Sequence, residues 1–266
     1  MRRYVELPKA RAGQTAALFS FPRDVLERII GEVRPPEREG TWLEVGGGLG
    51  TFAHLAQSKL PSWKVYLNEM NRDAMSFATA TYGLATIAGG PAEVAASGIK
   101  FDVISMIASL EHVPRPYELL SAYSALLRPG GRLVLGIPRF SPFNRAISHA
   151  SSASVTPPYH VSHFDEHNIA LLLRRIETLD ATSFTAWQDG PNAFKLIDFV
   201  KTWPYWRIEV PTKERDAPRF GMIEPYPHEM AVWINALHVA DEATRELIRQ
   251  LDGSLFLTMI ARRKPY

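Results

Sequence analysis

The chain has 266 residues, of which 46% are hydrophobic and 22% are charged, which suits a single soluble unit with a substantial core. Its formal net charge of +2 gives no reason to expect a nucleic-acid partner, and the absence of cysteine excludes disulfides, thiolate nucleophiles and cysteine-based zinc sites. No apolar run approaches the roughly 20 residues that cross a bilayer. The first residues lack the apolar core of a signal peptide, so we expect a cytoplasmic protein with no membrane partner.

Apolar and polar segments alternate through the first half of the chain. The pattern predicts helices at 22–33, 51–59, 73–82 and 116–127, with a short "PAEVAAS" segment after the third strand. The predicted strands are "TWLEVG", "KVYLNEM", "LATIAG", "FDVISMIA" and "RLVLGIP". Strands and helices that alternate in this order predict an α/β fold, with a parallel sheet and helices on both faces.

The second half is less regular. Residues 140–160 are rich in Ser, Ala and Pro and are expected to form a loop, and a helix is predicted to follow from an N-cap at Asp165. "TSFTAWQ" and "SLFLTMIARR" are expected strands that could pair as a hairpin. Between them, five prolines at 204–227 and two helical stretches suggest an insertion at about 190–250. We therefore expect one domain, with a core at about 22–188 and 252–264.

The stretch "WLEVGGGLGTF" turns from an apolar strand into a glycine cluster. The dinucleotide fingerprint is G-x-G-x-x-G, and no frame here fits it, because Thr51 stands where the third glycine should be. The pattern is G-x-G-x-G instead, formed by Gly46, Gly48 and Gly50. Such a turn lets the backbone approach a ligand closely, and a helix N-terminus beside it favours a carboxylate as readily as a phosphate.

Two acidic residues narrow the choice of ligand. Glu44 lies two residues before the first glycine, where a carboxylate suits a cationic group and not a pyrophosphate. Glu69 ends the second predicted strand, the place where an acid accepts hydrogen bonds from ribose hydroxyls in this architecture. Together they point to a ribose-bearing ligand with an ammonium and a carboxylate, and S-adenosylmethionine (SAM) has these groups.

With these residues in view, the chain resembles a class I SAM-dependent methyltransferase. "LEVGGGLGTF" resembles the first motif of that superfamily. The block "FDVISMIASLEHVPRPYELLSAYSALLRPGGRLVLGIP" and the later "PPYHVSHFDEHNIALLLRRIE" resemble the ubiquinone-biosynthesis-like group of small-molecule O-methyltransferases. The resemblance covers roughly residues 40–180. It implies a Rossmann-like seven-stranded sheet in the order 3-2-1-4-5-7-6, with strand 7 antiparallel.

The resemblance also implies a cofactor site for SAM. Glu44 and the turn of Gly46, Gly47, Gly48 and Gly50 would hold its methionine part. Glu69 would bind the ribose and Met70 would lie against the adenine, with Ile107 also at the site. Relatives usually carry an Asp that reaches the adenine amino group, but this chain has Pro91 there. Either Glu93 or backbone groups around Ala92 would replace it.

Methyl transfer to an oxygen needs an aligned acceptor and a group that takes its proton. A histidine suits that role near neutral pH. His112 follows the fourth predicted strand, and His160 and His163 precede the helix that Asp165 caps. His112 and His160 rank equally as the catalytic base, and His163 ranks below them.

The sequence also allows other interpretations, which concern metal sites, a substrate lid and the overall function. The spacing of His160, His163 and His167 would suit a metal on one continuous helix, but the helix is expected to start near Asp165, so we expect no metal there. Some relatives bind a divalent cation near "EHV", which makes Glu111 the other place to look. The aromatics of "DFVKTWPYWRI" could form a substrate lid. The rival functions are a dinucleotide oxidoreductase and a non-catalytic protein that binds SAM or a partner.

Overall fold

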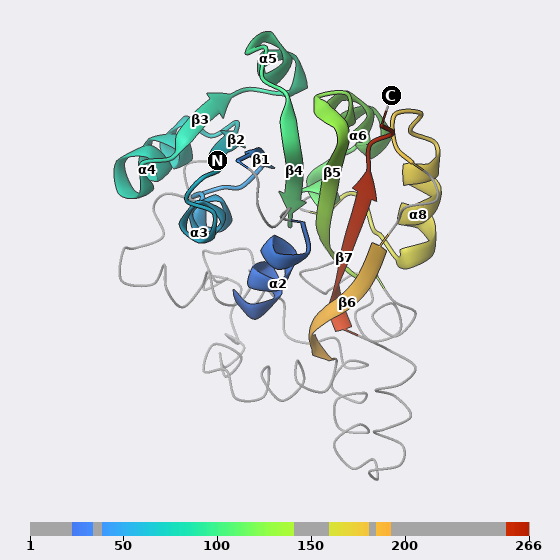
Figure 1. Ribbon diagram of the computed structural model, residues 1–266. Coiled ribbons are helices and arrows are strands. Elements are labelled where there is room, and N and C mark those ends of the chain that lie inside the picture. Colours follow the sequence, from blue (N-terminus) through green and yellow to red (C-terminus); the bar gives the residue numbers. More distant parts are fainter. Residues whose placement is uncertain (1–22, 34–38, 141–159, 181–184, 193–253, 266) are drawn as a thin grey trace, which may run out of the picture.

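The computed structural model describes residues 23–33, 39–140, 160–180, 185–192 and 254–265 (Figure 1). The loop predicted at 140–160 and the insertion predicted at 190–250, with its proline-rich stretch, helices and possible lid, lie outside these residues except at their ends. None of the described helices is long and apolar enough to cross a membrane.

The elements follow one another in alternating order. In chain order they are α2 (Arg23–Val33), β1 (Thr41–Val45), α3 (Thr51–Lys59), β2 (Lys64–Glu69), α4 (Arg72–Tyr82), β3 (Ala85–Ala88), α5 (Pro91–Ala96), β4 (Phe101–Ile107), a short 3-10 turn (Leu110–His112), α6 (Pro116–Ser124), β5 (Leu127–Pro138), α8 (Glu166–Arg174), β6 (Thr185–Asn192) and β7 (Ser254–Arg262).

Seven strands form one sheet in the order β3-β2-β1-β4-β5-β7-β6 (Figure 1). Neighbouring strands from β3 to β5 are parallel, whereas β7 pairs antiparallel with both β5 and β6. The predicted α/β fold, strand order and antiparallel last strand are therefore confirmed. The chain builds outward from β1 toward β3 and then from β4 toward β6, so the order reverses between β1 and β4, where such sheets bind ligands.

Each face of the sheet is covered by helices, because strand side chains alternate between the two faces. One core contains α2, α3 and α4 side chains packed on Trp42, Val65 and Leu67. The other contains side chains of α5, α6 and α8 packed on Leu43 and Tyr66. The N-cap predicted for the helix after residue 160 is confirmed. Asp165 precedes α8, and its side chain accepts a hydrogen bond from the Asn168 N–H.

The main departures from the predicted elements lie around β5 and β6. The "RPGG" segment was expected to follow a helix that ran to residue 127, but α6 ends at Ser124 and β5 begins at Leu127. Leu127 already pairs with Phe101, and the register then shifts before Val103 pairs with Arg132, so the glycines form an irregularity inside the strand. The sixth strand also extends to Asn192, beyond the predicted segment.

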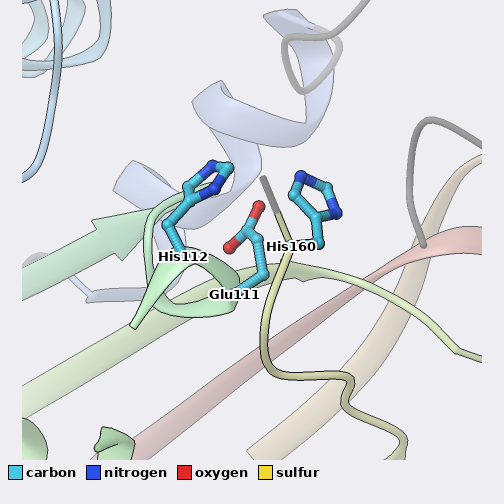
Figure 2. Close-up of side chains that lie close together, drawn as sticks. All are labelled: Glu111, His112 and His160. Atoms are coloured by element: carbon cyan, nitrogen blue, oxygen red, sulfur yellow. The ribbon is translucent and has the colours of Figure 1, made fainter. Parts of the chain in front are cut away.

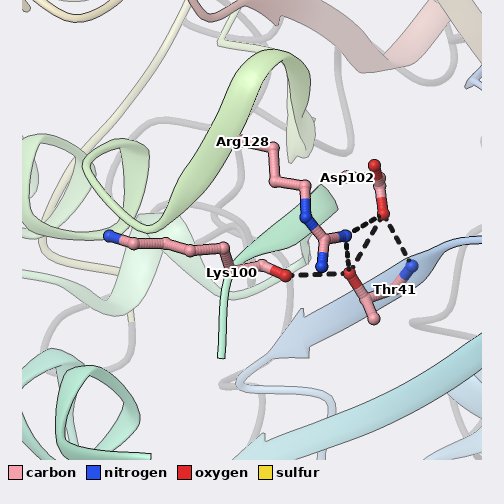
Figure 3. Close-up of polar contacts among 4 residues, drawn as sticks. All are labelled: Thr41, Lys100, Asp102 and Arg128. Carbon is pink, nitrogen blue, oxygen red and sulfur yellow. Dashed lines mark hydrogen bonds and ion pairs between the residues drawn. The ribbon is translucent and has the colours of Figure 1, made fainter. Parts of the chain in front are cut away.

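A polar network joins the strands at the edge of the sheet opposite to their carboxyl ends (Figure 3). Asp102 Oδ2 accepts from the Thr41 N–H at 2.9 Å and from Arg128 Nη1 at 2.5 Å, and Thr41 Oγ1 donates to the Lys100 carbonyl at 2.9 Å. Thr41 begins β1 and Asp102 lies at the start of β4. The network therefore fixes the two central strands at the end away from the candidate site.

Candidate cofactor and catalytic site

The glycine turn leaves β1 at its carboxyl end, on the central line of the sheet. The Gly46 N–H donates to the Asn68 carbonyl at 2.8 Å, which ties the turn to β2. A Cβ on Gly47 would lie 2.6 Å from Glu44 Cγ and 2.6 Å from Leu67 Cδ1, so only glycine fits there without displacing buried side chains. Gly48 differs, because its φ is +55° but its missing Cβ faces open space. The turn therefore presents its backbone, rather than side chains, at the carboxyl end of β1.

Glu44 lies directly beneath this turn and is only 1% exposed. Burial raises the pKa of its carboxyl well above the usual range, and hydrogen bonds from Ser105 Oγ and the Ile107 N–H oppose that rise. Ser105 Oγ in turn accepts from Trp42 Nε1 at 2.7 Å. Glu44 is thus held by β4 as well as β1, and its carboxylate joins the two strands between which the order of the sheet reverses.

Glu69, at the end of β2, holds the glycine turn by a hydrogen bond to its backbone. Its Oε2 accepts from the Gly48 N–H at 3.0 Å, and its Oε1 accepts from the Met70 and Asn71 N–H groups at 2.8 and 2.9 Å. A carboxylate has about four lone-pair positions, so it can still accept further hydrogen bonds. Met70 beside it is 75% exposed at this edge. Both residues therefore lie at the carboxyl end of β2, beside the glycine turn.

The loop after β3 closes the same edge. Glu93 Oε2 accepts from the Gly90 N–H at 2.7 Å and so caps α5, in which Ala92 is the second residue. A Cβ on Gly89, where φ is +93°, would lie 2.7 Å from Glu93 Cγ. One carboxylate oxygen of Glu93 is therefore bonded within the loop.

Three side chains gather at the carboxyl end of β4 (Figure 2). One ligand atom from each of Glu111, His112 and His160 lies within 4.8 Å of the others. The two imidazole rings are 4.8 Å apart and nearly perpendicular. Among the described residues, neither carboxylate oxygen of Glu111 has a hydrogen-bond partner. Burial raises the pKa of this carboxyl to about 7.

This cluster adjoins the glycine turn. Ser109, just before the 3-10 turn, donates from Oγ to the Val45 carbonyl at 3.1 Å. Its Cβ would lie 2.8 Å from a Cβ built on Gly46. The backbone that carries Glu111 and His112 is therefore packed against the turn, on the side toward β4.

The segment that carries His160 is tied to the same place by its backbone. The Val161 and Ser162 N–H groups both donate to the Glu111 carbonyl, at 2.9 and 3.1 Å. Ser162 Oγ donates to the Val113 carbonyl at 2.8 Å. These bonds bring together residues that are about fifty positions apart in the chain.

The other histidines of this segment lie elsewhere. Nε2 of His163 is buried without a hydrogen-bond partner among the described residues, and its ring is 4.8 Å from that of Phe140. His167 lies in the first turn of α8, which begins at Glu166, so His160 and His163 precede the helix as predicted. Neither His163 nor His167 belongs to the cluster of Figure 2.

Some of these residues carry no signal in the sequence. Ser105 supports Glu44, and Asn68 holds both the glycine turn and the loop after β3, yet each looks like an ordinary strand residue. Glu111 could be found only through its place in "LEHV", because its proximity to His160 depends on how the chain returns after β5.

Comparison with known families now identifies the chain. The profile of a family described as a methyltransferase domain matches residues 15–177, which is more than half of the sequence. The chain belongs to this methyltransferase family. It is a methyltransferase whose methyl donor is SAM, so the predicted enzyme class and cofactor are confirmed. The narrower ubiquinone-biosynthesis-like group stays a prediction. No curated protein sequence matches the chain.

Solved structures of methyltransferases share the fold at low identity. A SAM-dependent methyltransferase from Archaeoglobus fulgidus is 16% identical, with a TM-score of 0.60 over 94% of this chain and 98% of that chain. A possible histamine N-methyltransferase from Thermotoga maritima is 18% identical, with a TM-score of 0.56 over 98% and 97%. The plantazolicin methyltransferase BpumL in complex with SAH is 13% identical, with a TM-score of 0.56 over 99% and 93%.

Proposed function

We propose that this methyltransferase transfers the methyl group of SAM to a hydroxyl oxygen of a small-molecule acceptor, with His160 or His112 taking the proton. The observation that carries the proposal is the cluster of Glu111, His112 and His160 packed beside the glycine turn. In-line displacement needs the acceptor on the side of the methyl group opposite to sulfur. Alignment of the two reactants can contribute roughly 7–11 kcal/mol.

The cofactor would lie across the carboxyl ends of β1 and β2. Its methionine part would bind the backbone of Gly46–Gly50, above the buried Glu44. The ribose hydroxyls would donate to Glu69, which keeps lone pairs free of its bonds to the turn. The methyl group would then face β4, toward His112 and His160.

His160 and His112 differ in how well they could act as the base. His160 is half-buried and His112 is exposed, and their rings are in contact, so one can orient the other. The Glu111 carboxylate beside them would stabilise the imidazolium formed when either ring takes a proton. A carboxylate, an imidazole and a second imidazole thus support general-base catalysis at oxygen.

The same three side chains fit a divalent cation, which the resemblance to relatives with a cation near "EHV" suggests. One carboxylate and two imidazoles are ligands that Mn²⁺, Fe²⁺ and Zn²⁺ accept, and both oxygens of the buried Glu111 are without a partner among the described residues. When bound, such an ion would polarise the acceptor oxygen and ease loss of its proton.

Substitution of the histidines tests the proposed base. We expect His160→Ala or His112→Ala to lower the rate of methyl transfer at least roughly tenfold while SAH still binds. His54→Ala is the matched control, because His54 is exposed on α3, stacks on Tyr82 and does not belong to the cluster. If both cluster variants keep the full rate, the acceptor needs no histidine base. A screen of phenol, sugar-hydroxyl and amine acceptors with labelled SAM identifies the substrate for these assays.

A direct titration tests the cation. Calorimetry with MnCl₂ or ZnCl₂ alone should show one site per chain in the wild-type protein and none in Glu111→Gln. Equal binding by the two proteins would place any metal elsewhere. Because no acceptor is needed, this result is independent of the methyl-transfer assay.

A further inference from the structure

Asn68 makes three directed hydrogen bonds beneath the loop that follows β3. It is 2% exposed, and its Nδ2 donates to the Ile87 carbonyl at 2.8 Å and to the Gly89 carbonyl at 2.9 Å. Its Oδ1 accepts from the Tyr123 hydroxyl of α6 at 2.6 Å. Burial raises the pKa of Tyr123, so this hydroxyl remains a donor. All three polar atoms of the pair are satisfied without solvent.

The loop above this pair is shaped by its backbone. Gly89 adopts a positive φ that brings its Cα against the Glu93 side chain, and the Gly90 N–H is taken by Glu93 Oε2. Pro91 has no N–H to offer. A ligand at this loop would therefore meet the N–H of Ala92 rather than that of Gly90, on a backbone that the Asn68 side chain holds in place.

The same residue also holds the opposite side of the proposed cofactor site. The Asn68 carbonyl accepts from the Gly46 N–H, and the next residue, Glu69, binds the Gly48 N–H. Since the ribose would lie at Glu69, the base attached to it would extend toward the neighbouring strand, β3, and its loop. Asn68 therefore fixes the distance between the part of the site for methionine and the part for the base.

We infer that Asn68 and Tyr123 are positioning residues that hold the backbone of residues 89–92 where it discriminates adenine from other purines in the methyl donor. The inference rests on the proposed placement of the cofactor. It assigns selectivity for the base to a buried pair that does not touch the cofactor.

Binding of two nucleosides that differ only in the base tests this inference. S-adenosylhomocysteine and S-inosylhomocysteine differ only at C6 and N1 of the base. The first has an amine at C6 and an acceptor at N1, and the second has a carbonyl oxygen at C6 and an N–H at N1. We expect the wild-type protein to bind the adenine compound at least roughly tenfold more tightly, because a mismatched polar group at a fixed backbone is costly. In Tyr123→Phe this ratio should fall at least roughly threefold. A purely structural defect would weaken the binding of both compounds equally and leave the ratio of their affinities unchanged.

Two further variants keep the test decisive. Tyr117→Phe, on the same helix, removes a hydroxyl whose bond to the Arg175 carbonyl is exposed and should keep the wild-type ratio. Asn68→Leu combined with Tyr123→Phe removes the polar pair together, and this variant should also lose discrimination if the single variant does not fold. An unchanged ratio in every folded variant, or no preference in the wild type, overturns the inference. Failure of the wild type to bind either compound would instead overturn the proposed site.

Discussion

At the scale of single residues, the glycines of the turn have separate structural reasons. Gly47 is required by space, because a Cβ would meet Glu44 and Leu67, and Gly48 is required by its backbone angle alone. The sequence shows only that both are glycine. It does not show which buried side chains lie against the turn, since that depends on β2 packing beside β1.

Substitution of Gly47 and Gly48 should separate the effect of steric contact from the effect of the backbone angle. Gly47→Ala is expected to weaken SAH binding at least roughly tenfold, because Glu44 must shift beneath the turn. Gly48→Ala should cost about 1–2 kcal/mol of stability through its left-handed backbone. Gly31→Ala, on α2 where an added Cβ would meet nothing within 4 Å, is the control: it should keep the affinity for SAH and should not lower stability, because Ala favours a helix over Gly. Calorimetry with SAH and urea denaturation measure both quantities, and equal SAH affinity in Gly47→Ala and wild type would contradict the steric account.

The buried carboxyl of Glu111 should make stability depend on pH. Its pKa is about 7 in the folded chain against an ordinary value of 4.5, so the folded state binds the proton more tightly than the unfolded state. Stability should therefore fall as the pH rises from about 4.5 to 7, by roughly 3 kcal/mol from this group. In Glu111→Gln, with EDTA present, the fall should be smaller by the contribution of Glu111, and the part that remains comes from the buried Glu44. The exposed Glu118→Gln should keep the wild-type fall, and a Glu111→Gln protein with the wild-type profile would contradict the assignment.

At the scale of elements, the segment that carries His160 depends on its attachment to the turn after β4. Ser162→Ala removes the bond from Oγ to the Val113 carbonyl and should let His160 move away from Glu111. We expect kcat to fall roughly threefold to tenfold with the KM for SAM unchanged, because small misplacement of a catalytic group lowers the rate without weakening cofactor binding. Ser58→Ala, on the outer surface of α3, is the control. A rise in KM alone would show that the segment serves the cofactor instead.

The last strand offers a test of the packing in the sheet. Thr258 lies in β7 and is fully buried, and its hydroxyl has no hydrogen-bond partner among the described residues. Thr258→Val keeps the shape of the side chain and removes the buried hydroxyl, so it should stabilise the fold by about 1 kcal/mol. Urea denaturation measures the change, and a clear loss of stability would show that the hydroxyl is bonded.

At the scale of the whole molecule, the sequence predicted the order of elements well because βα alternation is a local pattern. The resemblance supplied the strand order and the antiparallel β7, which no local pattern contains. The contacts between distant segments could not be predicted from the sequence. The approach of His160 to Glu111 and the bonds from Asn68 to the loop after β3 are set by how distant segments pack. The "RPGG" segment was misplaced because its glycines suggested a break, whereas pairing with β4 extends the strand across it.

The most direct test of the account is titration of SAM into the wild-type protein and Glu69→Ala. Glu69 joins the ends of β1 and β2 at the point where the ribose would bind, so its loss should weaken binding at least roughly tenfold while the variant stays folded. The account predicts one SAM site per chain in the wild type and no tight binding of NAD. Equal affinity of the two proteins for SAM, or tight binding of NAD in its place, would contradict it.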